Sequence, residues 1–179
     1  EQSPVRITIV KERTRELFSG KFGAGKKFDL QFDSLQMIRY LNNNDSLDKF
    51  GADTNTVLSL IIPDTYLHKW NSSPEKLMQQ FYAAYKKFWN QERSAKAASA
   101  GLTPKQVMIL ASIVEEETNL KRDKFNIASV YLNRLKKGMR LQADPTVKFV
   151  TRNFQLGRIT GTHLKLESPY NTYLNAGLP

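Results

Sequence analysis

The stretch TPKQVMILASIVEEETNLKRDKFNIASVYLNRLKKG, residues 103–138, predicts two consecutive helices. Its first four residues, TPKQ at 103–106, form a capping box with a proline at the first helical position. The first helix continues to three consecutive glutamates at 115–117. The second runs over about 123–136, until Gly138 ends it. Apolar residues recur at helical spacing in both segments, so each helix has a face to bury.

Upstream of this stretch the sequence predicts strands and further helices. VRITIV at 5–10 alternates apolar and polar residues, which is typical of a half-buried strand. VLSLII at 57–62 predicts a buried strand that Pro63 stops. A short helix is expected at 11–18, and another, capped by the aspartate or serine at 33–34, to about residue 41.

A long helix is expected to begin at Ser73 and Pro74, a cap followed by a proline. Its aromatic stripe, which includes Phe81 and Tyr85, has the helical spacing of a core-facing surface. Downstream of the central stretch, residues 146–150 predict either a strand or a short helix. Together these elements predict an α+β fold in which helices pack on a small sheet.

The composition is that of a globular domain with an excess of positive charge. Of 179 residues, 40% are hydrophobic and 25% charged, which allows a buried core. The formal net charge of +10 favours polyanionic surroundings, although solvated surface lysines give the same balance. Zero cysteines exclude disulfides and thiolate chemistry, and two histidines argue against a histidine-rich metal site. No apolar run approaches the roughly 18 residues of a membrane span.

Two other binding motifs are weak. Gly20, Gly25 and Lys26 match most of the phosphate-loop pattern, but Lys27 replaces the hydroxyl residue that would hold magnesium. The residues before this loop also look helical and not strand-like. Lysines alternate with aromatic residues at 82–89, but a helix core needs those aromatics, and no nucleic-acid-binding signature is present. We therefore expect no nucleic acid partner and no nucleotide at this loop.

Among the three glutamates, helical geometry favours Glu117 as a general acid. Its neighbours one turn earlier are Val114 and Ile113, whereas Glu116 points furthest from the apolar stripe and Glu115 lies across the helix face. A carboxyl group among apolar side chains loses hydration, which favours the protonated form that a general acid needs. The alternative, a solvated acidic helix end that pairs with the basic residues following it, stays open.

Four segments, in this order, resemble the MltG (YceG-like) family of endolytic murein transglycosylases. They are PDTY at 63–66, ASIVEEET at 111–118, YLNRLKKGMRLQADPTV at 131–147 and SPYNTYLNAGLP at 168–179. The resemblance covers roughly residues 5–179, and the last two strings are long and unusual. Proteins of this family have often been filed as aminodeoxychorismate lyases. That label would call for a pyridoxal-phosphate lysine in a suitable larger fold, and the sequence does not support it.

The resemblance implies an enzyme that acts on peptidoglycan outside the cytoplasmic membrane. Such an enzyme is anchored in the inner membrane by a single N-terminal helix and faces the periplasmic or extracellular side. We expect residues 1–179 to be a trimmed catalytic domain that lacks this anchor and a LysM-like subdomain, with a helical subdomain at about 30–100. Peptidoglycan glycan strands are the implied substrate, and synthases of the elongation or division machinery are implied partners. No metal or cofactor is implied.

The implied activity is that of a carbon–oxygen lyase, a lytic transglycosylase that leaves 1,6-anhydro-N-acetylmuramic acid ends. The family's catalytic glutamate precedes a threonine, which points to Glu117, expected at a helix end in an open groove. One carboxylate suffices, because it acts first as acid and then as base. Two alternatives stay open: a hydrolytic muramidase with Glu115 or Asp144 as second carboxylate, and a non-catalytic wall-binding module. The supporting or substrate-binding candidates are Glu115, Asn133, Arg134, Gln142, Asp144, Tyr170, Asn171 and Tyr173.

Overall fold

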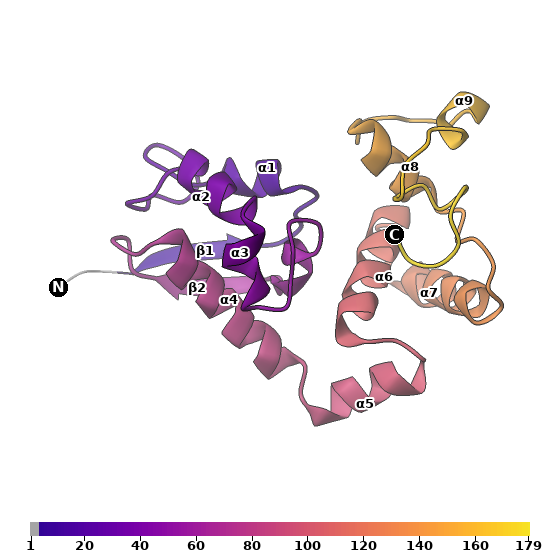
Figure 1. Cartoon of the computed structure of the whole chain (residues 1–179), viewed down its shortest axis with the longest axis horizontal. Helices are drawn as coiled ribbons and strands as arrows, with labels where there is room; N and C mark the ends of the chain where they lie inside the picture. The colour runs from indigo at the N-terminus through magenta and orange to yellow at the C-terminus, as the bar shows by residue number, and fades with distance from the viewer. Residues whose placement is uncertain (1–3) are drawn as a thin grey trace. The chain divides into compact units, whose positions relative to one another are not determined.

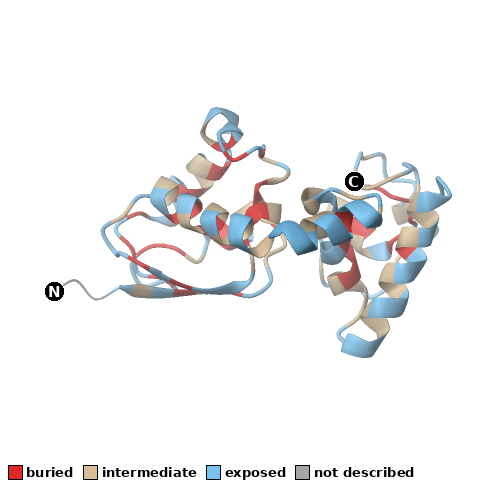
Figure 2. Ribbon diagram, turned by 90° about the horizontal axis from the view of Figure 1, so that it is seen from below, coloured by how far each residue is buried: buried red, intermediate tan, exposed pale blue. Residues whose placement is uncertain are grey.

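The computed structural model describes residues 4–179, and the chain divides into two compact units, residues 1–94 and 95–179 (Figure 1). Each unit buries its own cluster of hydrophobic side chains. Figure 2 marks the buried residues of both units in red on the ribbon. Helices accompany one small antiparallel sheet in the described part of the chain, so the predicted α+β class is confirmed.

The first unit contains the sheet. Strand β1 (Val5–Ile9) pairs antiparallel with β2 (Asp64–His68), with Val5 opposite His68. Ile7 and Ile9 are buried, as the alternation in VRITIV predicts. The helices of this unit are α1 (Arg15–Ser19), α2 (Ser34–Leu41), α3 (Asn44–Asp48), the 3₁₀ helix η1 (Val57–Leu60) and α4 (Pro74–Phe88).

The helix starts in this unit follow the predicted caps. Asp33 caps α2 through a capping box, and Ser73 caps α4 with Pro74 in its first turn. The aromatic stripe of α4 is core, because Phe81 is buried and packs edge-on against Tyr66 of β2. Residues of α2, α3 and α4, which lie within the predicted helical subdomain at about 30–100, share one buried cluster with β1. The boundary between the units falls after residue 94.

The prediction of a buried strand at 57–62 is wrong, because Val57–Leu60 form the 3₁₀ helix η1. Asp53 starts this turn: its carboxylate accepts from the Thr56 amide at 2.9 Å, and its carbonyl accepts from the Val57 amide at 3.0 Å. The backbone donors are therefore satisfied locally, without a partner strand. Burial of Val57 and Leu60 meets the apolar pattern equally well, and periodicity cannot separate the two structures over so short a run.

The second unit is helical in its described elements. Its helices are α5 (Gln91–Ser99, which begins before the unit boundary), α6 (Pro104–Glu117), α7 (Lys121–Lys136), α8 (Asp144–Thr151) and α9 (Gly161–Leu164). The predicted capping box at Thr103 is present, and Gly138 follows α7 with a φ of 65°, the left-handed region that glycine adopts without strain. Of the two predictions for residues 146–150, the helix is confirmed.

No single helix among residues 4–179 is long and apolar enough to cross a membrane, and only α5 and α6, taken together as a bent pair, meet that test by length and composition.

Candidate active site

An open pocket of about 400 Å³ lies in the unit of residues 95–179. Helix α7 forms one wall with its residues 126, 127, 130, 131 and 134. This helical spacing places them on a single face of the helix. Five of the predicted site residues reach this pocket. The lining residues are Glu117, Asn126, Ile127, Val130, Tyr131, Arg134, Gln142, Asp144 and Tyr173.

Glu117 is the last residue of α6 and is half-buried at the pocket wall. The apolar neighbours that the helical spacing assigns to it, Ile113 and Val114, are buried. Its Oε1 accepts a hydrogen bond from the Tyr131 hydroxyl of α7 at 2.5 Å. Burial raises the pKa of Tyr131, and the bond to Glu117 raises it further, so this phenol stays protonated and donates.

Tyr131 is a site residue that the sequence patterns place only in the helix core. It is 6% exposed and belongs to the buried cluster between α6 and α7. The available signal is chemical, because a buried tyrosine hydroxyl usually has a hydrogen-bond partner. The pattern cannot name that partner, which lies 14 residues away on another helix.

The second carboxylate of the pocket, Asp144, is engaged by a tyrosine. The Tyr173 hydroxyl donates to Asp144 Oδ1 at 2.6 Å. Burial, followed by this hydrogen bond, raises the pKa of Tyr173 to about 12. Asp144 is exposed at the start of α8, so its carboxylate faces both solvent and the pocket.

The loop between α7 and α8 presents Gln142 to the pocket in a constrained backbone conformation. Gln142 has a φ of 52°, which is uncommon for a residue other than glycine. Bonds on both sides hold it there. The Arg134 guanidinium donates to the Leu141 carbonyl, and the Gln142 amide donates to the Thr172 carbonyl at 3.1 Å. The Ala143 amide donates to Thr172 Oγ1 at 3.0 Å.

The whole chain, residues 1–179, matches the model of the YceG-like family. The chain belongs to this family. It is 47% identical over 73 residues to the endolytic murein transglycosylase of Bacillus subtilis, a match that covers 41% of this chain and 20% of the relative. It is 31% identical over 122 residues to the protein of the same name from Streptococcus pneumoniae, covering 66% of this chain and 22% of that relative.

The matches therefore span about a fifth of the length of these curated relatives. A crystal structure described as a YceG-like protein from Listeria monocytogenes superposes on this chain with a TM-score of 0.76. The two are 24% identical, and the superposition covers 98% of this chain and 61% of the other. This likeness shows that the fold is shared within the YceG-like family.

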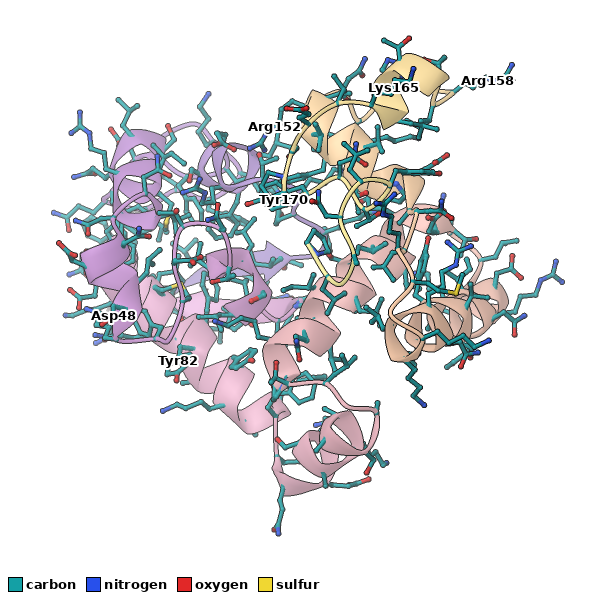
Figure 3. All side chains as sticks on the ribbon, turned by 45° about the vertical axis from the view of Figure 1, so that its right-hand side comes forward. Asp48, Tyr82, Arg152, Arg158, Lys165 and Tyr170 are labelled. Carbon is teal, nitrogen blue, oxygen red and sulfur yellow. The ribbon has the colours of Figure 1, made fainter. Side chains whose placement is uncertain are left out.

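The remaining four predicted site residues of this YceG-like chain do not line the pocket. Glu115 forms an ion pair with Lys124 of α7, and Asn133 is exposed on α7. Tyr170 packs edge-on against Phe149, with the ring centres 5.0 Å apart. The Arg152 guanidinium lies over the Phe149 ring as well. Figure 3 labels Tyr170 and Arg152.

Asn171, the fourth, is fully buried. Its amide donates to the Leu164 and Leu166 carbonyls at 3.1 and 2.8 Å, and its Oδ1 accepts from the Tyr173 amide at 3.0 Å. Its contacts are those of a residue that anchors a turn. Within residues 4–179, no cluster of three or more histidine, cysteine, aspartate or glutamate side chains could hold a metal ion.

Proposed function

We propose that this chain carries the catalytic centre of a peptidoglycan lytic transglycosylase that cuts within nascent glycan strands. One observation carries the proposal: Glu117 ends a helix at an open pocket and is held there by a neutral tyrosine, while the other pocket carboxylate is engaged by Tyr173. The names of the curated relatives agree with this chemistry.

The proposed reaction needs Glu117 alone as proton carrier. Protonated Glu117 gives its proton to the glycosidic oxygen, the bond from that oxygen to C1 of N-acetylmuramic acid breaks, and N-acetylglucosamine leaves with a hydroxyl group. The C6 hydroxyl of the same muramic residue then attacks C1, and its proton passes to the Glu117 carboxylate. The product is a 1,6-anhydro end, and Glu117 is protonated again for the next cleavage.

The walls of the pocket suit an N-acetylated sugar. Ile127 and Val130 give an apolar surface that a sugar face or an acetyl methyl group can cover, and Asn126 and Gln142 offer amide groups for hydrogen bonds. The volume of about 400 Å³ falls within the range of about 300–1,000 Å³ that small-ligand sites occupy. Residues 134–165 include eight lysines and arginines and one aspartate. This excess of positive charge favours binding of an anionic wall polymer.

A hydrolytic muramidase would need a second carboxylate to activate water. Glu115 is paired with Lys124 and does not line the pocket, and Asp144 accepts from Tyr173. These contacts favour the single-carboxylate reaction. We further propose that the full-length protein acts outside the cytoplasm, anchored in the inner membrane by one N-terminal helix, alongside peptidoglycan synthases.

Mass spectrometry of digested peptidoglycan tests the proposal. Anhydro ends are expected; reducing ends would indicate a hydrolase, and intact glycan that still binds the chain would indicate a wall-binding module. Glu117→Gln should lower anhydro-product formation by about 10²–10⁴-fold, the usual cost of losing a proton-transferring group. Glu116→Lys should be nearly silent and Glu115→Gln intermediate. Normal activity of Glu117→Gln together with loss of activity in Glu115→Gln would refute the assignment.

A further inference from the structure

The Tyr131 hydroxyl donates a hydrogen bond to the Glu117 carboxylate from the neighbouring helix. Glu117 ends α6, and its side chain would otherwise sample several rotamers at the pocket edge. Tyr131 comes from α7, is 6% exposed, and places its hydroxyl 2.5 Å from Glu117 Oε1. A single contact between two helices thus sets the direction of the carboxylate.

The ring of Tyr131 is itself held by the core of this unit. It belongs to the same buried cluster as Leu110, Ile113 and Val114, which lie on α6 one to two turns before Glu117. Because that cluster joins the two helices, the hydroxyl cannot move relative to the end of α6 without disturbing the packing. This packing suits a rigid support better than a mobile substrate contact.

We infer that Tyr131 is the positioning residue for Glu117: its hydroxyl occupies Oε1, so the proton exchanged with substrate is carried by Oε2. The catalytic consequence of this inference rests on the proposed function, whereas the contact itself does not. Burial raises the pKa of the Tyr131 phenol, so the phenol remains a donor to Glu117.

The other polar groups of the pocket have different principal partners. The Arg134 guanidinium, on α7, donates to the Leu141 carbonyl, and Tyr173 donates to Asp144 at the start of α8. Arg134 and Tyr173 both interact electrostatically with the Tyr131 phenol, Arg134 lowering its pKa and Tyr173 raising it. Arg134, Asp144 and Tyr173 are therefore the charged and titratable groups that surround the Glu117–Tyr131 pair in the pocket.

The decisive variant is Tyr131→Phe, which removes the hydroxyl and keeps the ring in the core. Glu117 becomes a carboxylate as it gives up its proton, so losing the hydrogen bond that stabilises this charge should lower kcat about 10- to 100-fold, with KM changed less than about twofold. The alkaline limb of the pH–activity profile should move to higher pH, because the carboxylate loses a donor that favours its ionised form. A raised KM with normal kcat would make Tyr131 a substrate contact and overturn the inference.

Tyr66→Phe is the matched control. Tyr66 is also 6% exposed, and its hydroxyl donates to the Ile62 carbonyl at 2.6 Å, but it lies in the other unit. It therefore loses an equally buried hydroxyl without touching the pocket, and its kcat and pH profile should match those of the parent chain. A loss as large as that of Tyr131→Phe would mean that any buried tyrosine hydroxyl has this effect, which would overturn the inference.

A second readout does not require activity. In ¹³C NMR, the carboxyl carbon of Glu117, assigned by its loss in Glu117→Gln, should titrate at higher pH in Tyr131→Phe than in the parent chain or Tyr66→Phe. An unchanged midpoint in Tyr131→Phe would overturn the inference whatever the activity. If the parent chain yields no anhydro ends, the proposed function fails, and the NMR titration alone still decides whether Tyr131 controls Glu117.

Discussion

Replacing Asn171 by alanine should destabilise the unit of residues 95–179 and leave glycan contacts largely intact. The side chain is fully buried and makes three hydrogen bonds to backbone groups, at the Leu164 and Leu166 carbonyls and the Tyr173 amide. These bonds fold the C-terminal turn onto the segment after α9. The family string places Asn171 among the groove candidates, so the outcome separates an anchoring role from a binding role.

The magnitude follows from the three bonds. Each net hydrogen bond contributes about 1 kcal/mol, and solvent can partly satisfy the released carbonyls, because Leu166 is exposed. We therefore expect a loss of about 2–3 kcal/mol in the free energy of unfolding of this unit. For a domain of this size, each kcal/mol lowers Tm by about 4–8 °C, so Tm should fall by about 10–20 °C.

The placement of the tryptophans allows the two units to be followed separately. The chain has two tryptophans, Trp70 and Trp89, and both lie in the unit of residues 1–94. During urea unfolding, tryptophan fluorescence therefore reports on the first unit, and far-UV circular dichroism reports on both. Asn171→Ala should move only the transition seen by circular dichroism to lower urea.

Asn133→Ala serves as the control, because Asn133 is exposed on α7 away from the pocket lining. Its stability should stay within about 0.5 kcal/mol of the parent chain. The reasoning is refuted if Asn171→Ala unfolds at the same urea concentration as the parent chain but no longer binds peptidoglycan sacculi. That result would make Asn171 a substrate contact.

Two further predictions concern the pocket. Arg134→Ala and Asp144→Asn should each weaken binding in a sacculus pull-down by about tenfold, with a smaller effect on turnover. The reason is that Arg134 holds the loop that carries Gln142, and Asp144 accepts the hydrogen bond of Tyr173. Unchanged affinity would contradict this role. Tyr173 has a pKa raised from its ordinary 10.0 to about 12, so its stabilising contribution is complete below about pH 10 and is lost as pH rises through about 12. Ultraviolet titration of tyrosinate should show one group fewer near pH 12 in Tyr173→Phe, whereas the loss of a group near pH 10 would contradict the prediction.

The local signals in the sequence were sufficient where a few adjacent residues decide the outcome. The capping box at Thr103, the helix stop at Gly138 and the burial of Ile7 and Ile9 all follow from spacings of one to four residues. The same short-range geometry places Glu117 beside the buried face of its helix. Such patterns act within one turn or one strand, so they do not depend on how the elements pack.

The sequence alone thus determined the class of the fold, the main helices and strand β1, and the helix end at which Glu117 lies. Tertiary structure alone decided that Tyr131 meets Glu117 across two helices, that Tyr173 reaches Asp144 over 29 positions, and that Asn171 turns into the core. It also decided that residues 57–60 form a 3₁₀ helix. The physical reason is that these partners are chosen by the packing of separate elements, and a hydrophobic pattern records that a side chain is buried but not what it touches.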